Sequence, residues 1–164
     1  MQQINTQQHP DDNQLIEVAV SQLSLAMIDW LIAKDEGVPV EFDGDCIRHS
    51  PEPYTCEGRY SPSTDPSIGH PLLEREKLQV RYIDCPGHSF HGLWMAQDCR
   101  FRSTSSSVGW SPYGRSIPAN DLGYLTGPTM LIAGLRFIIA KHRVGKCKAP
   151  AVRVPSKLVE ASKR

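Results

Sequence analysis

The chain has no excess of charge of either sign. Its 164 residues hold 18 lysines and arginines against 18 aspartates and glutamates, so the formal net charge at pH 7 is zero. Without a basic surplus, electrostatics give no reason to expect binding to DNA, RNA or an anionic membrane surface. We therefore expect no nucleic acid and no membrane among the partners of this protein.

Long apolar runs and a cysteine framework are also missing. No stretch reaches the roughly 18 uncharged apolar residues of a transmembrane helix, and Arg136 interrupts the longest apolar run near the C-terminus. The five cysteines are an odd number without regular spacing, and no signal-peptide pattern is present. Reduced thiols in a cytosol fit this pattern best, and the length favours one domain.

Metal-ligand spacing is present only in a weak form. Cys85, His88 and His91 are three residues apart, and Cys46 with His49 repeats one such step. Structural zinc sites usually pair two C-x2-C or H-x3-H elements, and this set has neither. We therefore interpret Asp84 to His91 as a turn and predict no metal and no cofactor, although metal binding by Cys85, His88 and His91 stays open. No catalytic motif is found.

The hydrophobic pattern predicts an α+β fold. It is a single domain in which an antiparallel β-sheet carries an N-terminal and a C-terminal helix, with long loops between them. The expected domain covers residues 11–148, between a disordered tail at 1–10 and a basic flexible tail at 149–164. The predicted elements are a helix over 15–34, strands over 38–42, 78–82 and 92–101, a hairpin turn at 43–44, a return strand from 46, loops over 49–59, 60–77 and 102–123, and a helix over 129–143.

The stretch Tyr60–Lys77 concentrates turn formers, hydroxyls and carboxylates. Pro62, Pro66 and Pro71 lie within ten positions, which argues against a helix or a central strand here. The short side chains of residues 61–65 can bond to their own backbone, as in ordinary turns, or they can bind a ligand. Both interpretations, a surface loop that holds itself together and a binding loop, stay open.

The start of the last helix offers a second polar feature. Thr126 or Gly127 is expected to cap it, with Pro128 at its first position, and free N–H groups there would favour an anion. Further along, Arg136 interrupts an apolar helix. A buried arginine needs a negatively charged partner, so we expect a pair with Asp29, Asp65 or Glu74, or contact with a ligand.

Several segments resemble one family, the NinX-like proteins of bacteriophages and prophages. The resemblance implies a phage accessory protein in the cytoplasm of the host cell, and it carries no established reaction. Pro66 stands where the family pattern has a tryptophan, and the serine-rich stretch after Phe101 is longer than usual. The matching pieces are Asp29-Trp30, Ala33-Lys34, Glu36-Gly37, Tyr60-Ser61-Pro62-Ser63-Thr64-Asp65, Gly69, Pro71-Leu72-Leu73-Glu74-Arg75-Glu76, Gly127-Pro128-Thr129, Leu131-Ile132-Ala133, Arg136 and Ala140.

These features favour a non-enzymatic binding module over an enzyme. Its partner would be a host factor, or a small nucleotide-type signal of antiphage defence that the protein sequesters. The alternatives are a small metal-assisted hydrolase or nuclease, and a structural helper bound to a phage or host protein. The first helix offers a surface for homo-oligomers. The predicted ligand-binding residues are Trp30, Tyr60, Ser63, Thr64, Asp65, Glu74, Arg75, Thr129 and Arg136.

Overall fold

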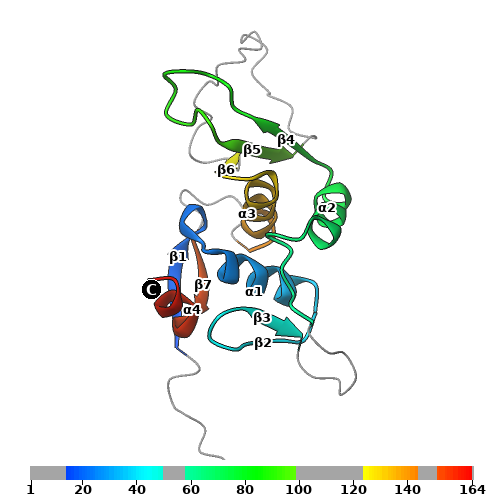
Figure 1. The fold of residues 1–164 in the computed structure, drawn as a ribbon, viewed down its shortest axis with the longest axis vertical. Helices are drawn as coiled ribbons and strands as arrows, with labels where there is room; N and C mark the ends of the chain where they lie inside the picture. The colour runs from blue at the N-terminus through cyan, green and yellow to red at the C-terminus, as the bar shows by residue number, and fades with distance from the viewer. Residues whose placement is uncertain (1–13, 50–57, 99–123, 144–150, 164) are drawn as a thin grey trace, which may run out of the picture.

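A computed structural model describes residues 14–49, 58–98, 124–143 and 151–163 of the chain. The predicted single α+β domain is confirmed, but the strands within these ranges form three separate antiparallel sheets. A three-stranded sheet lies at one end of the elongated molecule, two two-stranded sheets lie toward the other end, and α1 and α3 lie between them (Figure 1).

The element bounds are as follows. The helical elements are η2 (Val20–Gln22, a 3₁₀ turn), α1 (Leu25–Asp35), α2 (Pro66–Arg75), α3 (Met130–Arg143) and α4 (Ser156–Ala161). The strands are β1 (Leu15–Ala19), β2 (Val40–Phe42), β3 (Ile47–His49), β4 (Leu78–Tyr82), β5 (Trp94–Asp98), β6 (Leu125–Gly127) and β7 (Ala151–Pro155).

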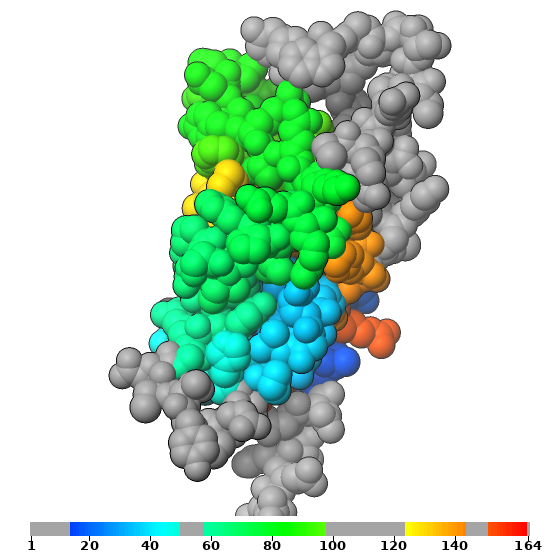
Figure 2. All heavy atoms as spheres, turned by 90° about the vertical axis from the view of Figure 1, so that its right-hand side faces the viewer, coloured from blue at the N-terminus to red at the C-terminus, as the bar shows by residue number. Residues whose placement is uncertain are grey.

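Helix α3 is the centre of the core. One face packs on the β4–β5–β6 sheet, where Ala133 and Phe137 meet Ala96. Other faces pack on α1 and α2. From the side, α2 and its neighbours lie over α3, whose orange atoms show along one edge only (Figure 2). One sheet was predicted to carry both long helices; instead α3 packs on the β4–β5–β6 sheet, and α1 packs against α3 and the β2–β3 hairpin.

Two glycines bring α2 and α3 close together. A Cβ atom added to Gly134 would lie 2.7 Å from the Cγ atom of Leu73. A Cβ atom added to Gly69 would lie 2.4 Å from the carbonyl oxygen of Pro62 and 2.7 Å from Leu131. Real side chains do not approach this closely, so the two helices can pack at this distance only because these positions carry no side chain.

The strands predicted in the middle of the chain are largely confirmed. Leu78–Tyr82 has the predicted bounds, whereas the strand predicted over 92–101 is described as Trp94–Asp98. The hairpin at Asp43 is also confirmed, with Phe42 opposite Ile47. The Asp43 carboxylate closes its turn by accepting hydrogen bonds from the N–H groups of residues 45 and 46, at 2.9 and 2.8 Å.

The helix predicted over 15–34 is wrong in its first half. Residues Leu15–Ala19 form β1, which pairs with β7 at the other end of the chain. Ile16, Val18 and Val20 repeat every second residue and are β-branched, which favours a strand. The helix begins only after Ser24, whose hydroxyl accepts a hydrogen bond from the Met27 N–H at 3.4 Å. That serine is a helix cap and marks the true start.

The basic flexible tail predicted from residue 149 is also wrong where the structure describes it. Residues 151–163 contain β7 and α4, and Val152, Val154 and Leu158 are buried in the core. Ile16 lies opposite Val154 and Val18 opposite Val152 in the β1–β7 pair. The segment folds by pairing with a strand more than a hundred residues away.

The loop predicted over 60–77 contains a helix, α2, from Pro66 to Arg75. Pro66 lies at the start, where a helix has no need of the missing N–H group. Asp65 is the N-cap, and its Oδ1 atom accepts from the Ser67 N–H at 2.9 Å. Pro71 lies inside the helix, and burial of the neighbouring Leu72 and Leu73 offsets its cost.

The predicted helix over 129–143 is confirmed as α3, but its start differs. Thr129 is the cap, with its Oγ1 atom accepting from the Ile132 N–H at 3.2 Å. Gly127 ends β6 and Pro128 precedes the cap. Among the described helices, none has the length and apolar character needed to cross a membrane. The tail predicted at 1–10 and the loop predicted over 102–123 lie outside the described residues.

Candidate functional site

The loop before α2 is held by a buried carboxylate on α1. The Oδ1 atom of Asp29 accepts a hydrogen bond from the backbone N–H of Ser63 at 2.8 Å. Asp29 is only 5% exposed, and burial raises its pKa to about 6, while the hydrogen bond from Ser63 and the charge of Arg59 act in the opposite direction. Ser63 itself is 2% exposed, so this contact lies inside the protein.

Two further predicted site residues stabilise the same region. Arg75 forms a two-pronged ion pair with Glu36, with N–O distances of 2.7 and 2.5 Å, and this pair lowers the pKa of Glu36. The ring of Tyr60 is buried and meets the His49 ring edge-on, with 5.5 Å between the ring centres. Burial, with the nearby carboxylates of Glu36 and Asp29, raises the pKa of Tyr60 to about 12. These contacts join α1, α2 and the β2–β3 hairpin.

The remaining hydroxyls and acids of the prediction have local roles. Asp65 and Thr129 cap α2 and α3, as described above. The Thr64 hydroxyl lies 3.5 Å from the carbonyl oxygen of Ser61, one turn back. Glu74 is exposed on α2. A role for these residues in ligand binding stays a prediction, but their structural contacts explain their presence without one.

Arg136 does not pair with Asp29, Asp65 or Glu74. Its Nη1 atom donates to the carbonyl oxygen of Thr126 at 3.0 Å and its Nη2 atom donates to that of Leu23 at 3.1 Å. Burial without an acidic partner lowers its pKa. The guanidinium therefore joins η2, β6 and α3 through backbone carbonyl groups.

Arg136 also lies apart from the hydroxyl-rich loop of residues 60–65, with which it was predicted to share a ligand. Leu131 and Gly134 face α2 and the carbonyl of Pro62, as their close approaches show. Arg136 follows Gly134 by two residues, which is about 200° around an α-helix. The loop and the arginine therefore lie on opposite sides of α3.

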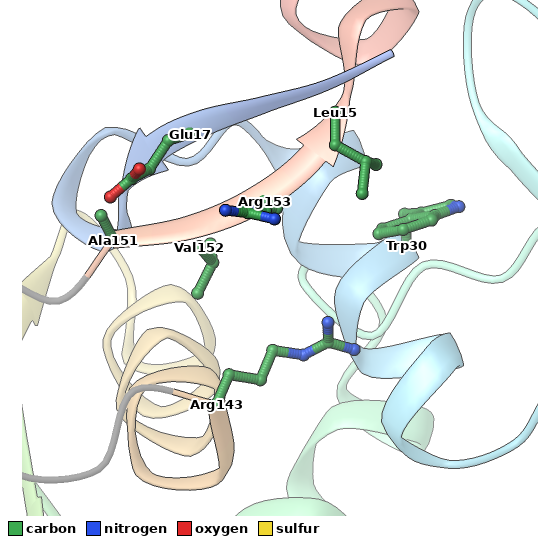
Figure 3. Close-up of a pocket in the computed structure, with 7 residues that line it drawn as sticks. All are labelled: Leu15, Glu17, Trp30, Arg143, Ala151, Val152 and Arg153. Atoms are coloured by element: carbon green, nitrogen blue, oxygen red, sulfur yellow. The ribbon is translucent and has the colours of Figure 1, made fainter. Parts of the chain in front are cut away.

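A hollow elsewhere in the molecule brings one predicted residue together with two arginines. It has a volume of about 560 Å³ and lies between the β1–β7 pair, α1 and the last residue of α3. Leu15 lies beside Trp30 at one end, Glu17 and Ala151 lie at the other, and the Arg153 guanidinium lies between them (Figure 3). The lining residues are Leu15, Glu17, Trp30, Arg143, Ala151, Val152 and Arg153.

Two arginines line this hollow, and each faces a carboxylate. Arg153 is exposed on β7, and Glu17 lies opposite it in the strand register. The Nη2 atom of Arg143 lies 2.6 Å from the Oδ1 atom of Asp35 and donates to the carbonyl oxygen of residue 31 at 3.1 Å. The ammonium group of Lys34 lies 5.7 Å from the centre of the Trp30 ring. The hollow thus combines guanidinium groups with a half-buried aromatic ring.

Such a combination can hold a ligand that has an anionic group and a flat ring. Guanidinium groups bind phosphate or carboxylate in a two-pronged manner, and an indole ring offers a face for stacking. The sequence predicted Trp30 but missed both arginines: Arg143 was the last residue of a predicted helix and Arg153 fell in the predicted flexible tail. The alternation of Val152 and Val154 around Arg153 was the available signal for a strand with an outward arginine.

The histidines of the turn between β4 and β5 accept hydrogen bonds from backbone groups. Among the described residues, no group of three or more His, Cys, Asp or Glu side chains is placed to hold a metal ion. The Nδ1 atom of His91 accepts from the Cys85 N–H at 3.1 Å, and that of His88 accepts from the Phe90 N–H at 3.1 Å. Both imidazoles therefore serve the turn between β4 and β5.

The fold and these contacts define a small single-domain α+β protein whose sequence motifs hold α1, α2 and the β2–β3 hairpin together. The chain matches the model of the family described as Bacteriophage P22, NinX, over residues 19–112. This match covers more than half of the chain, so the protein belongs to that family and is a phage accessory protein; the predicted resemblance is confirmed. None of the curated proteins matches the chain.

Proposed function

We propose that this phage accessory protein is a non-enzymatic binding module that sequesters a small nucleotide-type ligand. The ligand occupies the hollow lined by Trp30, Arg143 and Arg153. The observation that carries the proposal is the convergence of two guanidinium groups and an indole ring on one hollow of about 560 Å³. Ligand pockets for small molecules have volumes of about 300–1,000 Å³.

The two ends of the hollow match the two parts of a nucleotide. A base is flat and apolar on its faces, which suits Trp30 and the exposed Leu15 at one end. A phosphate group is anionic, which suits Arg153 and Arg143. Glu17 lies beyond the arginines at the opposite end, where it can accept hydrogen bonds from the second ribose of a dinucleotide or of ADP-ribose.

The setting of the function is the infected cell. A phage protein that holds a signalling nucleotide in the host cytoplasm lowers its free concentration and so blunts the defence that depends on it. Sequestration needs affinity and abundance but no chemical step. A metal-assisted hydrolase and a structural helper stay the alternatives predicted from the sequence, as does a host protein as partner.

The test is titration calorimetry of the purified protein with AMP, cyclic AMP, cyclic dinucleotides and ADP-ribose. We expect at least one of these ligands to bind with one-to-one stoichiometry. The variants Arg153→Gln and Trp30→Leu should each weaken that binding at least tenfold, because each removes one of the two recognition elements. Arg48→Gln is the matched control, since Arg48 pairs with Asp43 on the β2–β3 hairpin, outside the hollow.

Two results would overturn the proposal. One is the absence of binding across the whole panel. The other is binding that Arg153→Gln and Trp30→Leu leave unchanged, because the ligand would then occupy a different site. Circular dichroism and thermal unfolding of each variant separate a lost contact from a lost fold.

A further inference from the structure

Building on the proposed function, we infer that ligand binding at this hollow is coupled to proton uptake by His142. Asp35 holds Arg143 in the free protein. A bound phosphate competes for that guanidinium, and protonated His142 then compensates the Asp35 carboxylate. The ligand therefore binds more tightly as the pH falls.

The coupling rests on a carboxylate with two basic neighbours. The Oδ1 atom of Asp35 lies 2.6 Å from Nη2 of Arg143, which lines the hollow. The Oδ2 atom of Asp35 is buried and accepts no hydrogen bond from any described residue. The Nδ1 atom of His142 lies 3.8 Å from this second oxygen, too far for a hydrogen bond but within reach of a small side-chain shift.

His142 lies among charged groups from three helices. From α1 it faces Asp35, and the charge of Glu36 also acts on it. From the end of α2 it meets Glu76, whose Oε1 atom lies 3.1 Å from Nε2 of the imidazole. Lys141 on α3 pairs with the other oxygen of Glu76 at 2.6 Å. The imidazole thus lies between two carboxylates, those of Asp35 and Glu76.

The coupling arises because ligand binding weakens the ion pair that compensates the negative charge of Asp35. While Arg143 is paired, the carboxylate has a positive partner and one unsatisfied oxygen. When phosphate takes part of the guanidinium, the half-buried negative charge of Asp35 becomes costly unless another cation replaces it. An imidazolium at His142 can replace it, so ligand binding favours protonation. By thermodynamic reciprocity, protonation favours ligand binding to the same extent.

The direct measurement is the number of protons taken up on binding. Cyclic AMP and ADP-ribose are suitable probes because their phosphodiester groups do not titrate in the range tested. Calorimetry in two buffers with different ionisation enthalpies gives the proton number from about pH 5 to about pH 8, where histidine side chains change charge. We expect uptake of up to one proton, and an affinity gain of up to about tenfold per unit fall in pH.

Two variants test whether His142 is the group that takes up the proton. His142→Gln should bind as the parent does at high pH but lose the proton uptake and the pH dependence. Asp35→Asn should bind more tightly than the parent at high pH and also lose the pH dependence, since it removes the competitor for Arg143. His88→Gln, in the β4–β5 turn, is the matched histidine control and should behave like the parent.

The outcomes separate the two levels of the hypothesis. Binding without pH dependence, or pH dependence that survives in His142→Gln, overturns the coupling but leaves the proposed function standing. Failure of both probes to bind at any pH overturns the coupling, and failure of the wider panel as well overturns the proposed function. Asp29 also titrates, with a pKa of about 6, but its contribution is shared by the parent and His142→Gln and cancels in their difference.

Discussion

The carboxylate of Asp29 accepts a hydrogen bond from the backbone N–H of Ser63, 2.8 Å away and 34 positions later in the chain. This contact fastens the loop before α2 to α1. Arg75 and Glu36 repeat the same link at the other end of α2. The polar side chains of these motifs therefore hold the helices together, whereas Trp30 of the Asp29-Trp30 motif lines the hollow.

Substituting Asp29 by Asn should change how stability depends on pH. The pKa of Asp29 is about 6 in the folded protein, against an ordinary value of 3.8. Its stabilising contribution is complete below about pH 4 and is lost as the pH rises to about 6, because only the unfolded state releases the proton readily. The parent-minus-variant difference in unfolding free energy should fall by about 1–3 kcal/mol across this window. Urea unfolding at stepped pH measures it.

Asp65→Asn provides a control of opposite sign. The hydrogen bonds from Ser67 lower the pKa of Asp65, so its contribution is present at neutral pH and is lost as the pH falls. A flat difference for Asp29→Asn between about pH 4 and about pH 6 would contradict a buried, mainly desolvated carboxylate.

Gly134→Ala should destabilise the contact between α2 and α3. Alanine normally favours a helix over glycine, but here its Cβ atom would lie 2.7 Å from the Cγ atom of Leu73. Overpacking of this kind costs about 1–3 kcal/mol, which exceeds the gain in helix propensity. Thermal and urea unfolding give the change. The double variant with Leu73→Ala should lose less than the sum of the two single changes, and strict additivity would argue against the clash.

Thr129→Ala tests whether this predicted site residue is structural. The Thr129 hydroxyl caps α3 by accepting from the Ile132 N–H. Its loss should lower the unfolding free energy by about 1 kcal/mol. Affinity for any ligand of the hollow should stay the same, because Thr129 is not among the residues that line it. Thr64→Ala is the matched control with a weaker local contact. Weaker ligand binding with unchanged stability would instead support the binding role predicted from the sequence.

A chain that stops at residue 150 should lose stability and ligand binding together. Removing β7 exposes the partners of Val152 and Val154 in the core and leaves β1 without its paired strand. It also removes Arg153 from the hollow. Thermal unfolding of the shortened chain should show a transition at a clearly lower temperature, or none that is cooperative. A melting temperature equal to that of the full chain would restore the interpretation of these residues as a flexible tail.

Local patterns in the sequence predicted several elements correctly. The alternation of Leu78, Val80 and Tyr82 predicted β4, and the turn at Asp43 predicted the β2–β3 hairpin. The apolar spacing from Leu131 to Ile139 predicted α3. In each case, residues that are close in sequence carry the signal.

Other elements were missed because their signals conflict or lie far apart. β1 alternates like a strand, but its residues also continue the apolar pattern of α1, and its partner β7 begins at Ala151. The number of prolines in and before α2 argues against a helix, but the position of Pro66, at the start of α2, favours one. The hollow was missed for a related reason, since Trp30 and Arg153 are brought together only by the β1–β7 pairing.

The sequence by itself determined the α+β class, the family and those elements whose side-chain period is local, because hydrogen bonds and apolar faces within a short segment fix them. Only the tertiary structure decided that Arg136 bonds to backbone carbonyls, that Asp29 holds Ser63, and that Arg143 and Arg153 share a hollow with Trp30. The physical reason is that a buried charge needs a partner, and many candidates along the chain satisfy that need equally well. Packing alone chooses among them.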